Sequence, residues 1–158
     1  MTAEEKRQFT ARISQANKSE LVVILFEMFD YCIEQAEQGF KSSDLEKADK
    51  YLKSAKGCVS ELRGNLDLKY EISYNLYSIY SFVNRQLIES IVKRKAVNLD
   101  SVREDMGKLH DAFEEVAKKD TSKSVVENSQ QVYAGLTYGK GTLNEVFMDN
   151  EITRGFKA

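Results

Sequence analysis

The segment from Asn65 to Glu89 constrains the fold of this chain more than any other stretch, because as a helix it carries two apolar faces. One face is an aliphatic stripe with intervals of three and four residues, formed by Ile72, Leu76, Ile79, Val83 and Leu87. The other face lies roughly 100° or more around the helix and is formed by Tyr70, Tyr74, Tyr77 and Ile88. A surface helix needs an apolar arc of only about 100° to dock on a core. We therefore expect something besides an ordinary bundle neighbour to cover the second stripe.

Capping patterns predict where two further helices begin. Asn17 followed by Glu20 is a capping-box variant, so the first long helix is expected to start at Asn17 and to run to about Gly39. Ser43 followed by Glu46 has the same pattern and predicts the next start. The absence of proline from the whole chain permits such long, uninterrupted helices.

The ends of the helices follow from glycine and lysine positions. The helix from Ser43 is expected to end near Gly64, and the two-faced helix near Arg94. A fourth helix is expected from about Asn98 to about Lys119, whose lysine-rich last turn suits the helix dipole. The first long helix also has a wide apolar arc, which is extended on one side by Val22, Phe26, Phe29 and Ile33.

Short connections favour antiparallel neighbours, so the chain is expected to be all-α. The predicted architecture is an antiparallel four-helix bundle with an N-terminal arm and an irregular C-terminal extension. The expected boundaries are 1–16 for the arm, 17–120 for the bundle and 121–158 for the extension.

The arm and the extension each allow two interpretations. The arm is a mobile segment or a short helix, and its Phe9 and Ile13 form either a hydrophobic staple or a displaceable lid. The extension packs on the bundle or is mobile, and if it packs it either extends the bundle or competes for the partner site. Its apolar residues are Val132, Tyr133, Leu136, Tyr138, Leu143 and Phe147.

Composition limits the classes of partner. A net charge of −2 gives no electrostatic footprint for nucleic acid. No apolar run approaches the ~18 residues of a membrane span, and the start MTAEEKRQF is too polar for a secretory signal. We therefore expect a cytoplasmic protein without stable membrane insertion. Cys32 and Cys58 lie on apolar stripes too far apart in register for a disulfide, and both are predicted to be reduced core residues.

Catalytic, metal-binding and cofactor sites are not expected. A di-iron bundle needs Glu-x-x-His pairs, but the one histidine, His110, has Gly107 three residues before it. No candidate catalytic nucleophile has a recognisable general base to activate it. A histidine phosphotransfer domain is an alternative, although the residues after His110 are Asp111, Ala112 and Phe113 rather than a Lys-Gly pair. A boundary-position histidine is the other interpretation.

The segment LDLKYEISYNLYSIYSFVNRQLIES, followed by a helix that contains DAFEEV, resembles the FliS family of flagellin-specific export chaperones. The family's Leu-Tyr, Tyr-Asp-Tyr-Met, Arg-Arg-Leu and Glu-Ala-Asn patterns correspond to Leu76-Tyr77, residues 80–83, residues 85–87 and Glu89-Ser90. The start FTARISQANKSELVVILFE is similar too. The resemblance covers about residues 9–117, with order and spacing kept. It departs from the family at Asn17-Lys18, where the family has Ser-Pro, and at Phe113, where the family has Trp.

The resemblance implies a cytoplasmic chaperone that binds the disordered C-terminal segment of flagellin. Such a protein prevents premature polymerisation and delivers flagellin to the flagellar type III export gate, with its arm covering part of the groove until the client displaces it. A monomer or weak homodimer is expected. The residues expected to bind the partner are Phe9, Ile13, Val22, Phe26, Ile33, Tyr70, Tyr74, Tyr77, Tyr80 and Ile88. A generic helical adaptor for another client is the alternative.

Overall fold

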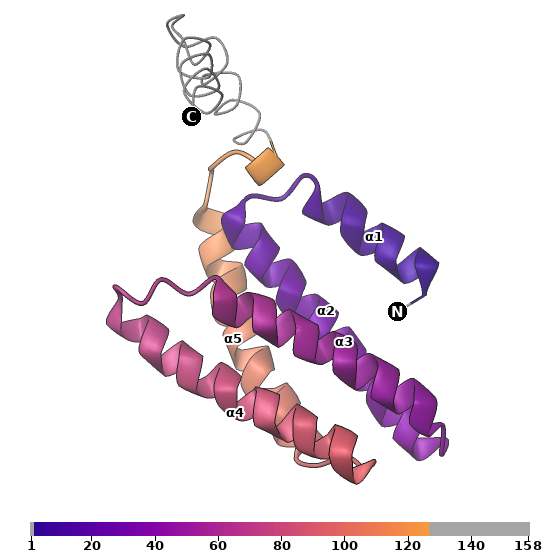
Figure 1. The fold of residues 1–158 in the computed structure, drawn as a ribbon. Coiled ribbons are helices and arrows are strands. Elements are labelled where there is room, and N and C mark those ends of the chain that lie inside the picture. Colours follow the sequence, from indigo (N-terminus) through magenta and orange to yellow (C-terminus); the bar gives the residue numbers. More distant parts are fainter. Residues whose placement is uncertain (1, 127–158) are drawn as a thin grey trace, which may run out of the picture. The chain divides into compact units, whose positions relative to one another are not determined.

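The computed structural model describes residues 2–126, and those up to Val125 belong to one compact unit. The unit contains helices α1 (Ala3–Ile13), α2 (Lys18–Lys41), α3 (Leu45–Gly64), α4 (Glu71–Lys93) and α5 (Leu99–Lys119). The four long helices form the bundle, and α1 lies along α2 outside it (Figure 1). The prediction of an all-α bundle is confirmed, and the arm is helical. The extension expected over 121–158 lies outside the described residues from 127 onward.

Side-chain caps set the starts of α2 and α3. The Asn17 side chain accepts a hydrogen bond from the Glu20 amide at 2.9 Å, and the Glu20 carboxylate accepts one from the Asn17 amide at 2.8 Å. The predicted start of α2 is therefore confirmed. The predicted cap at Ser43 is wrong by one residue, because Asp44 accepts the hydrogen bond from the Lys47 amide at 2.9 Å. Ser43 has a φ of 60° and serves the turn out of α2 instead.

The two-faced helix begins later than its sequence pattern indicates. Residues 65–70 form a connection, in which the Asp67 side chain accepts a hydrogen bond from the Lys69 amide at 3.0 Å. The Asp67 carbonyl accepts a second one from the Tyr70 amide at 3.2 Å. Such local bonds offer the backbone an alternative to the helix. Helix α4 thus starts only at Glu71, with Tyr70 at its N-cap position.

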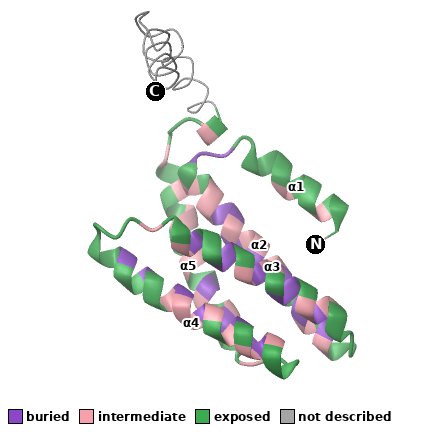
Figure 2. Ribbon diagram, viewed as in Figure 1, coloured by how far each residue is buried: buried purple, intermediate pink, exposed green. Residues whose placement is uncertain are grey.

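Helix α2 is the centre of the bundle, since it packs against α1, α3 and α5. Its wide apolar arc is therefore covered from several sides, and Figure 2 shows the buried residues gathered on α2 and α3. Phe26 and Ile33, predicted to be partner-binding residues, are buried in this core. The largest fully buried side chains include Tyr80, Phe26, Phe29, Ile33, Leu52, Leu87 and Met106.

Helix α4 is rotated relative to the predicted orientation. Its buried stripe consists of Ser73, Leu76, Tyr80, Val83, Leu87 and Ser90. Placing Ile72 in the core stripe is therefore wrong, since Ile72 is 61% exposed. Tyr80 takes the inward position, and its ring centroid lies 6.4 Å from that of Phe26.

Both cysteines behave as predicted. Cys32 and Cys58 are buried and free. Burial raises the pKa of the Cys32 thiol to about 12 and that of the Cys58 thiol to about 11. Because the thiolate is the reactive form, both groups are chemically quiet core residues. Among the described residues, no helix is long and apolar enough to cross a membrane.

The crossing of α2 and α3 near their hairpin depends on Gly39. A Cβ atom at this position would lie 2.7 Å from the Ala48 amide nitrogen and 2.9 Å from the Asp44 carbonyl oxygen. Both neighbours are backbone atoms, so neither can rotate away. The absence of a side chain at Gly39 lets the two helices meet.

Gly39→Ala is expected to destabilise the protein by roughly 1–3 kcal/mol through overpacking. Gly57→Ala is the matched control, because a Cβ at Gly57 would meet nothing within 4 Å. Helix propensity alone should then raise stability there by up to about 1 kcal/mol. Urea unfolding followed by circular dichroism measures both. Equal effects of the two substitutions would contradict the close approach at Gly39.

Candidate partner-binding surface

Helix α1 is held on the bundle by polar contacts. None of its residues is buried. The Arg12 guanidinium forms a two-pronged ion pair with the Glu27 carboxylate of α2, with one bond of 2.9 Å. The Glu5 carboxylate accepts hydrogen bonds from the Tyr31 hydroxyl at 2.5 Å and the Tyr51 hydroxyl at 3.3 Å. The arm is therefore positioned at both ends by charged groups.

The apolar part of this attachment is small. The Phe9 ring is half-buried and its centroid lies 6.5 Å from that of Tyr31, whereas Ile13 is 38% exposed. Exposed ion pairs contribute about 0–1 kcal/mol each. Helix α1 thus has a defined position and a weak hold.

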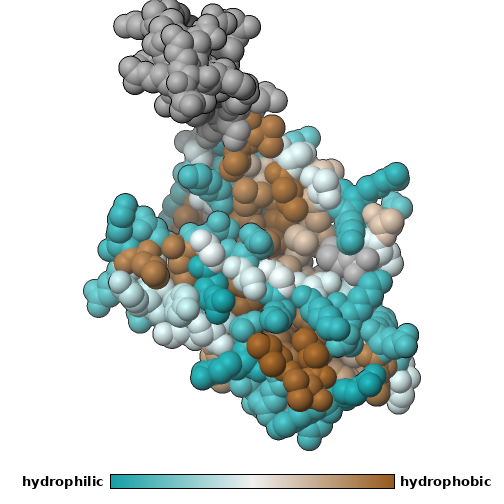
Figure 3. All heavy atoms as spheres, viewed as in Figure 1, coloured by the Kyte–Doolittle hydropathy of each residue, from teal (hydrophilic) through white to brown (hydrophobic). Residues whose placement is uncertain are grey.

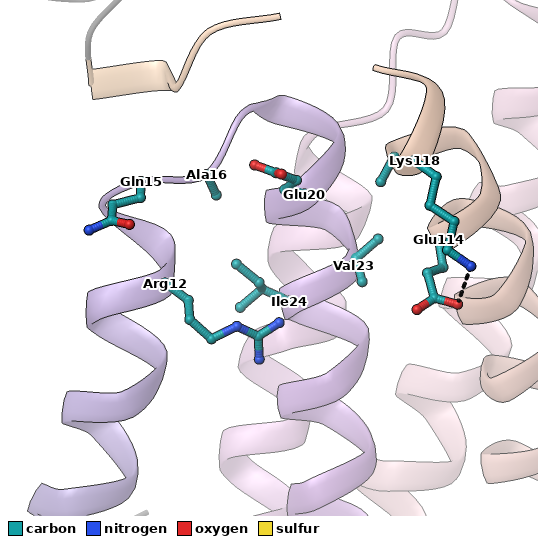
Figure 4. Close-up of a pocket in the computed structure, with 9 residues that line it drawn as sticks. Arg12, Gln15, Ala16, Glu20, Val23, Ile24, Glu114 and Lys118 are labelled. Carbon is teal, nitrogen blue, oxygen red and sulfur yellow. Dashed lines mark hydrogen bonds and ion pairs between the residues drawn. The ribbon is translucent and has the colours of Figure 1, made fainter. Parts of the chain in front are cut away.

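A first hollow lies where the end of α1 approaches α2 and α5. Its volume is about 450 Å³, and Ala16, Val23, Ile24 and Ala117 contribute its apolar lining. Figure 4 shows the Arg12 side chain extending from α1 toward α2, and the Glu114–Lys118 ion pair on the α5 side.

A second hollow, of about 380 Å³, lies between α2 and α5 one to two turns farther along. Its floor contains Phe26, Phe29 and Met106. Charged groups surround it, and the Arg103 guanidinium on its rim bonds the Asp30 carboxylate at 2.6 and 3.1 Å. A Cβ at Gly107 would meet nothing within 4 Å, so this side of the hollow is open.

The two hollows form one line. Their α2 rim residues form two neighbouring rows, each with intervals of three and four: Glu20, Val23, Ile24, Glu27, Asp30, Tyr31 and Glu34. The α5 rim does the same with Arg103, Gly107, His110, Glu114, Ala117 and Lys118. Such intervals keep residues on one helix face. The rim from Glu20 to Glu34 is about 21 Å long at ~1.5 Å per residue. We call this line the α2–α5 groove, and the Arg12–Glu27 pair stands between its two hollows.

The outward face of α4 is a second apolar surface. Tyr70, Tyr74 and Tyr77 are 64%, 58% and 44% exposed, and Ile88 and Val92 are exposed on the same face of the helix. Figure 3 shows hydrophobic spheres over both ends of α4 on the viewed face. Apolar patches of this kind on a single chain commonly mark interaction sites. We call the exposed residues Tyr70, Tyr74, Tyr77, Ile88 and Val92 the α4 patch.

The structure separates the sequence-predicted site residues into three groups. Tyr70, Tyr74, Tyr77 and Ile88 lie in the α4 patch. Phe9, Ile13 and Val22 lie on α1 or on the half-buried start of α2. Phe26, Ile33 and Tyr80 are core residues, of which only Phe26 lines a hollow. A surface role for Ile33 and Tyr80 is therefore corrected, because α2 is central and α4 turns Tyr80 inward.

The α5 rim of the groove was missed by sequence reasoning. Its residues belong to a helix with an ordinary apolar stripe, and nothing in that stripe signals a groove. The rim combines charged residues with Gly107 and Ala117, which lack bulk. Only the pairing with α2 makes this face concave.

His110 occupies the predicted boundary position. Its ring is half-buried, and its centroid lies 6.3 Å from that of Phe26 in an edge-on arrangement. Nδ1 is 3.4 Å from the Asp111 carboxylate, and Nε2 is buried without a hydrogen bond. In the part of the chain that the structure describes, no His, Cys, Asp and Glu side chains gather into a potential metal site.

Comparisons with known proteins give a consistent picture. A family model described as flagellar protein FliS matches residues 1–120. The chain is similar to the flagellar secretion chaperone FliS of Bacillus subtilis (strain 168), with 22% identity over 108 residues, 68% of this chain and 81% of that protein. It is also similar in fold to a crystal structure of a flagellar chaperone from bacteria. That match has a TM-score of 0.60 and 17% identity, and covers 66% of this chain and 87% of the other.

The docking of α1 is expected to weaken at acid pH. Burial would raise the pKa of Glu5, but hydrogen bonds from Tyr31, Thr2 and Tyr51 outweigh it and hold the pKa below its ordinary value. The ionised Glu5 carboxylate therefore stabilises the docked α1 fully above the ordinary pKa of a glutamate. This stabilisation is lost as the pH falls through the lowered pKa of Glu5 in the folded chain. Hydrogen-exchange protection factors of α1 should be lower near pH 3 than near pH 6. Glu5→Gln should reduce this difference, and an unchanged difference would exclude Glu5 as its source.

Proposed function

The chain belongs to the FliS family of flagellar chaperones, and we propose that its client is the disordered C-terminal segment of flagellin. Binding in the cytoplasm keeps this segment from polymerising early and presents it to the flagellar type III export gate. The proposed role is binding rather than catalysis.

The observation that carries the proposal is apolar surface that the described bundle leaves uncovered. A disordered client that folds on binding loses about 2–5 kcal/mol to ordering. At about 25 cal/mol per Å² of apolar area, offsetting this loss takes roughly 80–200 Å². A single buried aromatic side chain contributes about 150–250 Å², and the α4 patch presents Tyr70, Tyr74 and Tyr77. The exposed parts of the three rings are therefore comparable with the apolar area needed to offset the ordering cost.

The α2–α5 groove supports binding of a helical part of the same client. Its rim of about 21 Å matches a helix of ~14 residues. An amphipathic helix that lies in an apolar groove is a common mode of peptide recognition. Displacement of α1 is inexpensive because α1 contributes no buried residue. The client thus has two places to bind, a helix groove and an aromatic patch.

Tyr74→Glu is expected to weaken binding of a flagellin C-terminal peptide at least tenfold, which is a loss of about 1.4 kcal/mol. Stability should change little, because Tyr74 is exposed. Asn75→Glu introduces the same charge at the neighbouring exposed position and is the matched control. Isothermal titration calorimetry measures the dissociation constants.

Two outcomes would count against these claims. Equal binding by the Tyr74 and Asn75 variants would remove the α4 patch from the client site. No heat with the unsubstituted chain at micromolar concentrations would reject flagellin as the client and favour an adaptor for another protein.

A further inference from the structure

Helix α1 presents three chemically different side chains to α2 along one face. Glu5 is followed after four residues by Phe9, and Phe9 after three residues by Arg12. These intervals place the three on one side of a helix. Their partners are the Tyr31 and Tyr51 hydroxyls for Glu5, the Tyr31 ring for Phe9 and the Glu27 carboxylate for Arg12.

We propose that α1 copies the contact pattern of the client helix that displaces it. The client then carries a carboxylate, a large apolar side chain four residues later, and an arginine or lysine three residues after that. It runs along α2 in the same direction as α1. This inference rests on the proposed function, and adds which side chains the client needs.

Charge on the groove favours a cationic occupant. When α1 leaves, the Glu27 carboxylate loses its guanidinium partner. The rim then carries Glu20, Glu27, Asp30, Glu34 and Glu114 as acids, with Arg103 and Lys118 as cations. Arg103 is already bonded to Asp30, and Lys118 to Glu114. An occupant without a cation at this place leaves Glu27 unpaired between two hollows, which is unfavourable.

At the other end of the α1 contact, the two tyrosine hydroxyls favour an occupant with a hydrogen-bond acceptor. The Tyr31 and Tyr51 hydroxyls both point to one carboxylate in the docked state, and their ring centroids lie 6.2 Å apart. An occupant with an acceptor at this position keeps both donors satisfied. An apolar side chain there does not, so the pattern has a defined polarity along α2.

The client can also fill a hollow that α1 leaves empty. The first hollow, of about 450 Å³ beside Arg12, stays open when α1 is docked, and Val23 and Ile24 line it. An apolar client side chain next to the cation fills this space. That added burial lets a free segment compete with α1, whose covalent link gives it a high effective concentration.

Two charge reversals of the same ion pair test the proposal in the full-length chain. Arg12→Glu repels α1 from Glu27 while leaving the groove intact, so a flagellin C-terminal peptide should bind several-fold more tightly. Glu27→Arg also releases α1 but removes the group that the client needs, so binding should weaken at least tenfold. Calorimetry measures both, and hydrogen exchange of α1 verifies that it is released in each.

The controls separate this inference from the proposed function. Glu61→Arg, at an exposed position on α3, makes the same charge change and should leave binding unchanged. A peptide whose arginine or lysine at the patterned position is replaced by glutamate should bind the Glu27→Arg chain better than the unsubstituted one.

Tighter or unchanged binding by the Glu27→Arg chain would overturn the copied pattern while leaving flagellin as the client. Absence of binding by the unsubstituted chain and by the Arg12→Glu chain would reject flagellin itself. A Glu61→Arg variant that weakens binding as much as Glu27→Arg would also overturn the pattern, because the effect would then follow net charge alone.

Discussion

Burial of α2 on several sides is the constraint on which the rest of the structure depends. Phe26 and Ile33 are buried although both lie on α2, because neighbouring helices pack around it; the rings next to Phe26 are Tyr80 of α4 and His110 and Phe113 of α5. Close contact with α3 requires Gly39, where even a methyl group would meet backbone. With α2 at the centre, α4 packs mainly on α3 and only slightly on α5. One side of α4 is therefore left largely exposed, and that side carries the tyrosines, although the Arg63 guanidinium lies 5.5 Å from the Tyr77 ring centroid.

The helix boundaries were largely predictable, because they depend on local chemistry. The Asn17–Glu20 capping box and the ends at Gly64 and Lys119 lie where short-range patterns place them. The rotation of α4 was not predictable from the same information. Its sequence offers two apolar faces, and periodicity alone does not say which one is buried. In the folded chain Tyr80 packs against Phe26 and is buried, whereas Ile72 is exposed.

The α2–α5 groove shows a different limit of sequence reasoning. Each rim taken alone is an ordinary mixed helix face, with acids on α2 and small or charged residues on α5. Concavity arises from how far apart the two helices lie, and no residue pattern within one helix encodes that distance. The arm was predicted to be a cover from its likeness to a family, whereas its attachment through Glu5 and Arg12 became visible only with the coordinates.

A cover made of polar contacts solves a thermodynamic problem for a binding protein. If α1 were held by buried apolar residues, each would oppose the client by about 1.5–3 kcal/mol. Exposed ion pairs and hydrogen bonds instead fix the position of the helix at little cost to its release. The same groups discriminate strongly, because an occupant that fails to replace them leaves Glu27 and Tyr31 unpaired. In the proposed binding mode, weak attachment of α1 and selection of the client depend on the same few side chains, while affinity depends on apolar surface elsewhere.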